Sequence, residues 1–276
     1  MPIITLTTDF GLKDHFVGAV KGAIYNELKD VRIVEISHQL TPFNITESAY
    51  VLKNAYKHYP EGTIHIVGVD SEISVENKPI AMKLDGQYFI CCDNGILSMI
   101  TNEINPERMV EVTISNSDEN KFKVLGLFVT VACHIARGGM LEVIGKKIDT
   151  IKNIYELQPQ VNVDQNQIVG SVIYIDNFGN VISNISKNLI QQVGKGRPYE
   201  IIVRNYTFTR IYDGYNEVVD FEVPIEKRQD DGKRMALYNS ADLLQIAIYR
   251  SNLKTVGGAS SLLGLDYRDT ITIRFS

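Results

Sequence analysis

Residues 3–18 of this chain read Ile3-Ile4-Thr5-Leu6-Thr7-Thr8-Asp9-Phe10-Gly11-Leu12-Lys13-Asp14-His15-Phe16-Val17-Gly18. The β-branched run at the start of this stretch predicts a strand, and the helical spacing of apolar residues from Phe16 onward predicts a helix. Two carboxylates, Asp9 and Asp14, lie in the polar turn between the two elements. They are therefore expected at the carboxyl end of a strand, where open α/β sheets bind their ligands.

The composition of this turn favours a ligand with hydroxyl groups over a ligand with phosphates. A phosphate cradle needs glycine-rich backbone, whereas this turn offers one glycine and two aspartates that would repel a phosphate. Asp9 could accept two hydrogen bonds from a ribose diol, as an acidic residue does in dinucleotide sites. Two plainer roles remain open: Asp14 as the N-cap of the helix, and Asp9 as an ordinary turn residue.

Length and composition limit the class of protein. A chain of 276 residues that is 44% hydrophobic can form two domains with real cores. A net charge of -5 argues against a general partner for nucleic acid or anionic membranes, because such partners bind a clustered basic surface. No apolar run reaches the length of a membrane span, and no signal-peptide pattern is present. Cys91, Cys92 and Cys133 form neither a disulfide framework nor a metal knuckle, so we expect a reducing cytoplasm.

The first half of the chain alternates predicted strands and helices. Asp85-Gly86 between two apolar runs predicts a hairpin, which adds an antiparallel element. We therefore expect an α/β domain over residues 1–158, with a mostly parallel sheet flanked by helices. The expected helices span residues 16–28, 45–59 with Asn44 or Thr46 as cap, 96–100 and 127–137, and the expected strands span residues 31–36, 64–69, 80–84 and 88–91.

Beyond about residue 160 the pattern changes to short strand-like runs separated by turns, which marks a domain boundary. We expect a smaller, mainly β, barrel-like domain over residues 159–276. The expected strands span residues 169–175, 201–209, 217–223, 235–238, 243–248 and 270–275. Within this half, the turn that contains Asp176, Phe178 and Asn180 could hold an amine, a ring face and an adenine-like edge, or it could be a β-turn without a ligand.

Five segments follow one family pattern in chain order. They are Thr7-Thr8-Asp9-Phe10-Gly11-Leu12-Lys13-Asp14, residues 36–43, residues 93–97, residues 174–182 with Phe178-Gly179-Asn180, and Asn239-Ser240 ahead of residues 243–247. Together they resemble the S-adenosylmethionine hydroxide adenosyltransferases, which are related to the fluorinase and chlorinase enzymes. The resemblance implies an N-terminal α/β domain, a C-terminal β domain, and a homotrimer that holds its ligand between neighbouring subunits.

The resemblance also implies roles for residues of the first domain. Asp9 matches the acceptor of the ribose diol. Asp14 and Phe16 lie at the start of a helix that faces the substrate. Phe43 takes the place of an aromatic ring that packs on the substrate.

In the second domain the resemblance assigns the rest of the binding site. Asp176 would hold the methionine amino group, Phe178 would stack on adenine, and Asn180 would bond the edge of the adenine. Asn239 and Ser240 match a segment that receives the methionine carboxylate.

The family's catalytic residues are matched only in part. The resemblance implies an Asp, an Arg and a His that prepare the attacking water, and Asp70 matches the Asp. Asn77 stands where the Arg is expected, and Lys123 stands where the His is expected. Losing an acid-base or positioning partner typically costs about 10²- to 10⁴-fold in rate. Lys123 is either a replacement cation or an exposed surface lysine.

Three functions therefore remain open. The first is hydrolysis of S-adenosylmethionine to adenosine and methionine, slowed by the two replacements. The second is a catalytically silent binder or sensor of S-adenosylmethionine or adenosine, and the third is substitution by halide, for which residues 123–126 offer no obvious halide-binding group. No metal or cofactor is expected, because the histidines lack metal-ligand spacing, and His38 and His65 fit hydrogen-bonded core positions.

Overall fold

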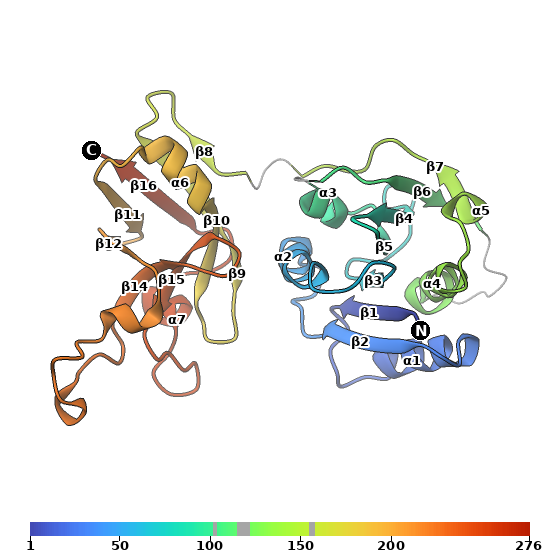
Figure 1. Ribbon diagram of the computed structural model, residues 1–276, viewed down its shortest axis with the longest axis horizontal. Helices are drawn as coiled ribbons and strands as arrows, with labels where there is room; N and C mark the ends of the chain where they lie inside the picture. The colour runs from blue at the N-terminus through green and yellow to red at the C-terminus, as the bar shows by residue number, and fades with distance from the viewer. Residues whose placement is uncertain (102–103, 115–121, 155–157) are drawn as a thin grey trace. The chain divides into compact units, whose positions relative to one another are not determined.

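The computed structural model of the protein describes residues 1–101, 104–114, 122–154 and 158–276 (Figure 1). The chain divides into two compact units, Met1–Ile154 and Tyr155–Ser276. In the described ranges no helix is both long and apolar enough to cross a membrane.

The first unit is built on one sheet with the strand order β2-β1-β3-β5-β4-β6-β7. The strands β2, β1, β3 and β5 pair in parallel, whereas β4 lies antiparallel between β5 and β6, and β7 is antiparallel to β6. The expected α/β domain with a mostly parallel sheet and a hairpin is therefore confirmed. The strands are β1 Ile3–Thr8, β2 Arg32–Ser37, β3 Ile64–Gly68, β4 Pro79–Leu84, β5 Gln87–Cys92, β6 Arg108–Val112 and β7 Gly145–Lys147.

Helices cover both faces of this sheet. Alternate residues of β5 enter two separate cores: Ile90 packs with residues of α1 and α4, and Phe89 packs with residues of α2 and α3. This alternation is the two-residue period of a strand that is buried on both faces. The helices are α1 Phe16–Glu27, α2 Ile45–Tyr56, α3 Ile96–Thr101, the π-helical turn η1 Val124–Phe128, α4 Val129–Ala136 and α5 Leu141–Ile144.

Helix α2 begins as predicted and ends earlier than predicted. The Asn44 side chain accepts a hydrogen bond from the backbone N–H of Glu47 at 3.1 Å, which makes Asn44 the N-cap. The helix ends at Tyr56 instead of Tyr59, because His58 and Tyr59 donate to carbonyls three residues back in tight turns. The strands β6 and β7 were not predicted, because they are short and rich in charged residues.

The second unit is a nearly closed, barrel-like β-sheet, as expected. Its strands follow the order β12-β11-β16-β9-β10-β15-β14-β13, and β8 pairs with β9. Most pairs are antiparallel, and β13 and β14 are parallel. The strands are β8 Gln160–Val161, β9 Gln167–Ile175, β10 Val181–Ser186, β11 Tyr199–Val203, β12 Tyr206–Phe208, β13 Ile211–Tyr212, β14 Arg234–Tyr238, β15 Leu243–Ile248 and β16 Thr270–Phe275.

Two of the strands predicted in this unit differ from the structure. The predicted strand 217–223 is wrong: it lies in the short helix η2 (Tyr215–Val218) and the turns after it, since Glu217 accepts a bond from the Asp213 N–H and pairs with Arg210. The predicted strand 201–209 is a hairpin of β11 and β12, which turns at Arg204 with φ of +50°. Further helices are α6 Lys187–Gly194, α7 Ala259–Leu263 and the short η3 Ile225–Lys227.

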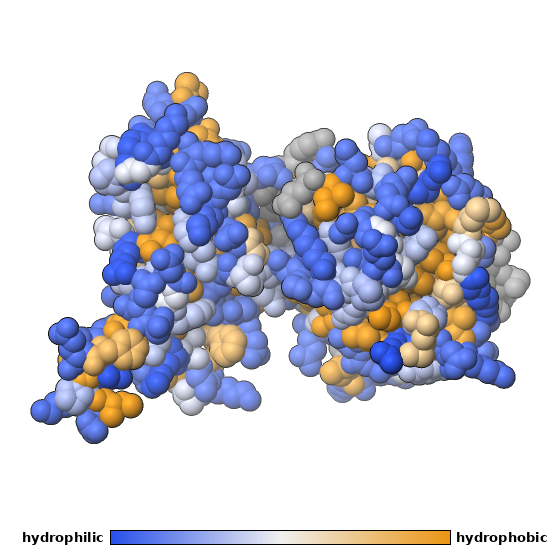
Figure 2. Space-filling model, viewed as in Figure 1, coloured by the Kyte–Doolittle hydropathy of each residue, from blue (hydrophilic) through white to orange (hydrophobic). Residues whose placement is uncertain are grey.

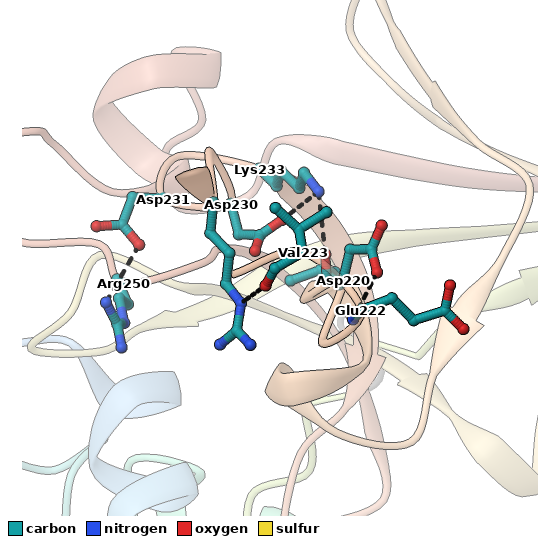
Figure 3. A network of polar contacts seen from close by, with 9 residues as sticks. Asp220, Glu222, Val223, Asp230, Asp231, Lys233 and Arg250 are labelled. Carbon is teal, nitrogen blue, oxygen red and sulfur yellow. Dashed lines mark hydrogen bonds and ion pairs between the residues drawn. The ribbon is translucent and has the colours of Figure 1, made fainter. Parts of the chain in front are cut away.

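A long segment projects from the sheet between β13 and β14 and carries η2 and η3 (Figure 1). In the view of Figure 2 most of the surface is polar, and apolar side chains gather on this segment, where Phe221 and Ile225 are exposed. Lys233 fastens the segment, because its Nζ atom donates to the Val218 carbonyl at 3.1 Å and to the Asp230 carboxylate at 2.5 Å (Figure 3). The segment is therefore tied to the start of β14.

Candidate functional site

The turn after β1 is held by the segment that follows β2. Asp9 Oδ2 accepts a hydrogen bond from the Phe43 N–H at 2.9 Å, and the Gly11 N–H donates to the His38 carbonyl at 2.7 Å. The other oxygen of Asp9 accepts no hydrogen bond from the part of the chain that the structure describes. A carboxylate has room for several donors, so Asp9 holds the turn and still has acceptor capacity for a ligand.

His38 supports this turn from within the fold. Its Nδ1 atom lies 2.7 Å from the Thr8 hydroxyl, and the ring is 3% exposed. Burial lowers the pKa of His38, which favours the neutral ring. His65 is similarly placed, between the Thr5 hydroxyl at 2.7 Å and Gln87 Oε1 at 2.8 Å, and burial lowers its pKa to about 4. Both histidines therefore have the hydrogen-bonded core role that was predicted.

Three phenylalanine rings form an apolar wall beside Asp9. The ring of Phe10 lies 5.1 Å from that of Phe122 and 6.1 Å from that of Phe16, between centroids. Gly68 at the end of β3 makes room for this wall, since a Cβ atom there would come within 2.9 Å of the Phe10 ring. A larger residue at position 68 would push Phe10 out of place.

Phe43 is displayed to solvent. Its side chain is 74% exposed, and its backbone has φ of +62°, a left-handed conformation that is uncommon for a residue with a bulky side chain. The bond from its N–H to Asp9 and the cap of α2 by Asn44 hold the backbone on either side of it. An exposed aromatic ring held in a strained conformation is typical of a binding surface.

Asp70 follows β3 and opens a loop that Asn77 closes. Asp70 has φ of +45°, and its carbonyl accepts bonds from Asn77 Nδ2 at 3.0 Å and Asn94 Nδ2 at 3.2 Å. Asn77 Nδ2 also donates to the Glu72 carbonyl at 2.8 Å. The amide nitrogen of Asn77 thus donates both of its hydrogens to backbone carbonyls of its own loop.

These elements meet around one cavity of about 660 Å³ in the first unit. Its volume is typical of a pocket for a small molecule. The cavity brings together four of the predicted site residues, Asp9, Phe16, Phe43 and Asp70, and adds two that contribute charge, Glu72 and Lys123. Lys123 is exposed at the start of η1, and it is also among the residues that line the cavity.

Asp14 is the predicted residue of this unit that lies apart from the cavity lining. It is exposed, and the interpretation of Asp14 as the helix cap is wrong. Helix α1 begins at Phe16 with His15 at the N-cap, and no side chain caps it. The Asp14 carboxylate is one residue too early to reach the free N–H groups of the first turn.

In the second unit, Asp176 organises the turn between β9 and β10. Its Oδ1 atom accepts bonds from the N–H groups of Phe178 and Asn180, both at 2.9 Å, and its Oδ2 atom accepts one from Asn180 Nδ2 at 2.8 Å. The Gly179 N–H donates to the Asp176 carbonyl, and Gly179 has φ of +76°. Residues 176–179 therefore form a β-turn.

The same turn presents Phe178 and anchors Asn180. Phe178 is 59% exposed, whereas Asn180 is 3% exposed. Asn180 Nδ2 donates a second bond to the Tyr215 hydroxyl at 3.1 Å, and Gln245 Nε2 donates to that hydroxyl at 2.5 Å. Asn180 Oδ1 is buried and finds no donor among the described residues. Sequence reasoning missed Tyr215, which lies outside the family segments, and passed over Gln245, which lies within one of them.

Asn239 and Ser240 lie in the turn between β14 and β15. Asn239 Oδ1 accepts bonds from the N–H groups of Ala241 and Leu243, both at 3.0 Å, and Ser240 is exposed. Asn239 thus shapes the turn, and Ser240 is the more accessible of the two for a ligand.

The chain matches two family models, in the order in which the two units occur. The SAM hydroxide adenosyltransferase N-terminal domain matches residues 4–145, and the SAM hydroxide adenosyltransferase C-terminal domain matches residues 170–272.

Individual relatives span nearly the whole chain. A protein of Methanocaldococcus jannaschii named (R)-S-adenosyl-L-methionine hydrolase is 31% identical over 281 residues, which cover 99% of this chain and 96% of the relative. A fluorinase of Nocardia brasiliensis is 25% identical and covers 89% of this chain and 90% of its own length. The crystal structure of an uncharacterized conserved protein from Thermotoga maritima superposes with a TM-score of 0.82 at 27% identity, covering 99% of both chains.

Proposed function

Since this chain belongs to the SAM hydroxide adenosyltransferase family, we propose that it binds S-adenosylmethionine and hydrolyses it to adenosine and methionine. In this reaction the oxygen of a water forms a bond to C5′ of the ribose, and the bond from C5′ to sulfur breaks. The sulfur keeps the electron pair and leaves as the neutral thioether of methionine. A proton of the water passes to a base or to solvent.

The observation that carries the proposal is the cavity of the first unit. Asp9, the exposed Phe43 and the Asp70 loop all line it, and Asp9 uses one of its oxygens for the Phe43 N–H. Asp9 offers acceptors for a ribose diol, and Phe43 offers a face for the nucleoside. Three carboxylates and one amine line this cavity, an arrangement that suits the cationic sulfonium of the substrate better than an anionic ligand.

The second unit, taken by itself, offers further groups that suit parts of S-adenosylmethionine. Phe178 is exposed and free to stack on a base, and the buried oxygen of Asn180 needs a donor such as an adenine amino group. The Asp176 carboxylate would receive the methionine amine in addition to its three bonds within the turn, and Ser240 would meet the methionine carboxylate.

One observation supports the second candidate function, a catalytically silent binder of S-adenosylmethionine or adenosine. The family resemblance implies an arginine at position 77, but Asn77 is engaged with the carbonyls of Asp70 and Glu72. Asp70 is then the single matched member of the water-preparing group, with Glu72 and Lys123 as its charged neighbours in the cavity. Binding of S-adenosylmethionine does not depend on the water-preparing group, so we expect binding from both the hydrolase and the silent binder.

Incubation of the purified protein with S-adenosylmethionine, followed by chromatography for adenosine and methionine, separates the two candidates. Release of both products supports hydrolysis. Calorimetric binding of adenosine without any product supports the silent binder. If the protein shows no binding and forms no product, both candidate functions are refuted. If hydrolysis occurs, Asp70→Asn is expected to lower its rate by less than the roughly 100-fold seen when a working base is lost.

We also propose a homotrimer in the cytoplasm, with S-adenosylmethionine as ligand and no resident cofactor. The resemblance supports the trimer, and the three cysteines, which are buried and unpaired, suit a reducing compartment. Light scattering tests the assembly, and a monomer that binds adenosine tightly would contradict it.

A further inference from the structure

Asn180 has one unused hydrogen-bonding position. Both N–H bonds of its amide are committed, one to Asp176 Oδ2 at 2.8 Å and one to the Tyr215 hydroxyl at 3.1 Å. The carboxylate fixes the orientation of the amide, because an amide oxygen in that place would face the negative oxygen of Asp176. Oδ1 therefore stays buried without a partner, as a pure acceptor.

The Tyr215 hydroxyl beside it is left as a donor. A phenolic oxygen has two lone pairs and one proton. The lone pairs are taken by Asn180 Nδ2 and by Gln245 Nε2, which donates at 2.5 Å from a side chain that is 5% exposed. The proton of Tyr215 is thus free to bond a group outside this cluster. Burial and the nearby Asp176 raise the pKa of Tyr215, so the hydroxyl keeps this proton at neutral pH.

Tyr215 is held firmly enough to discriminate between ligands. It lies in η2, where Lys233 binds the Val218 carbonyl and Glu217 both receives the Asp213 N–H and pairs with Arg210. The side chain is 40% exposed, unlike its buried partners Asn180 and Gln245, so it is the member of this cluster that a ligand can reach first.

We propose that Tyr215 determines specificity for the base, because its hydroxyl proton and Asn180 Oδ1 form a donor–acceptor pair that reads a 6-aminopurine. The acceptor takes a hydrogen from the exocyclic amine, and the donor binds the ring nitrogen next to it. Gln245 is the positioning residue that keeps the hydroxyl proton directed away from the cluster. This inference rests on the proposed function, since it assumes that a nucleoside stacks on Phe178.

The pair rejects a 6-oxopurine for a physical reason. Such a base places an oxygen opposite Asn180 Oδ1, and two acceptors repel each other and leave both unpaired. On the edge that contains N1, it also places an N–H opposite the donor of Tyr215. A site that bonds a polar group of its ligand discriminates strongly against an analogue that lacks it.

Calorimetry with four nucleosides tests the proposal: adenosine, purine riboside without the amine, and the 1-deaza and 7-deaza forms of adenosine. The full-length wild type should bind purine riboside about tenfold more weakly than adenosine, and it should bind one of the two deaza forms about tenfold more weakly. Tyr215→Phe should bind adenosine about tenfold more weakly than the wild type does. Its affinity for that deaza form should equal that of the wild type, so that the preference for the ring nitrogen disappears. Tyr212→Phe, which removes a hydroxyl from the neighbouring strand β13, should keep the wild-type pattern.

Two results would overturn the inference. One is a wild type that binds both deaza forms as tightly as adenosine, a measurement that needs no variant to fold. The other is a Tyr215→Phe protein whose affinity for all four nucleosides falls by the same factor, since the hydroxyl would then only support the fold. A wild type that binds none of the four nucleosides refutes the proposed function together with this inference. The two results above refute the inference alone.

Discussion

The Asp9 turn of the first unit and the Asp176 turn of the second unit place the same side chain at the end of a strand, but they use it differently. Asp176 receives three hydrogen bonds from its own turn, through both oxygens. Asp9 receives one from Phe43, and Asp9 is among the residues that line a cavity. The number of N–H groups within reach of the carboxylate, and not the residue type, therefore decides how much of an aspartate's acceptor capacity the fold uses.

The largest expected effect tests the structural side of this comparison. Asp176→Ala removes the two oxygens that accept three hydrogen bonds and leaves donors of the turn unpaired, so the free energy of unfolding should fall by about 3 kcal/mol. Urea denaturation of the whole chain, followed by circular dichroism, measures it. Asp176→Asn keeps an acceptor oxygen and serves as control with a smaller loss. A loss below about 1 kcal/mol for the alanine variant would contradict the contrast between the two turns.

Asp9→Ala tests the Asp9 turn, the second member of this comparison. It should weaken adenosine binding by about 1–3 kcal/mol, roughly 10- to 100-fold, because ribose hydroxyls lose their acceptor. The free energy of unfolding should change by less than about 1 kcal/mol, since a single bond to Phe43 is lost. Calorimetry and urea denaturation of the same variant give both numbers. Unchanged affinity would remove Asp9 from the proposed site.

Acidification should destabilise the first unit, because His65 in strand β3 takes up a proton when the unit unfolds. The pKa of His65 falls from 6.5 to about 4 on folding, so the unfolded chain binds the proton first as the pH drops. Stability from this residue is complete above pH 6.5 and is lost as the pH falls toward 4, with about 2 kcal/mol gone at pH 5. Denaturation at pH 7.5 and pH 5 measures it, and His65→Asn should flatten that difference. An equal pH dependence in the variant would show that other groups cause the loss.

The smallest effect is expected at Asp14, in the same turn as Asp9. Asp14 is exposed, caps no helix and lies outside the cavity lining. Asp14→Ala should therefore change unfolding by less than about 0.5 kcal/mol and adenosine affinity by less than about twofold. A loss comparable to that of Asp9→Ala would extend the binding site along the turn.

Periodic patterns made much of the fold predictable. The strands β1, β3 and β5 are apolar runs, and α2 has both a cap and a helical spacing, so local sequence and tertiary structure agree. The strand predicted at residues 217–223 failed because Glu217 bonds neighbouring backbone, a local preference that periodicity does not record. The missed β6 and β7 depend on neighbours in the sheet for their conformation.

The candidate site was predictable where family segments carried it. Asp9 and Phe43 come from two of the family segments and Asp70 from the family's catalytic pattern, and all three line one cavity. Tyr215 could not be found in this way, because it lies in a segment without a strand or helix period and its hydroxyl is held by Asn180 and Gln245. A residue that is positioned by partners distant in sequence has no local signature.

The closure of the Asp70 loop by Asn77 has a consequence for any attempt to restore the family's arginine at this position. An arginine at position 77 would remove the amide that binds two loop carbonyls, and its larger side chain would have to leave the interior of the loop. Restoring the family's arginine by Asn77→Arg therefore also removes both of these hydrogen bonds, so the variant changes how the loop is held as well as the charge at position 77.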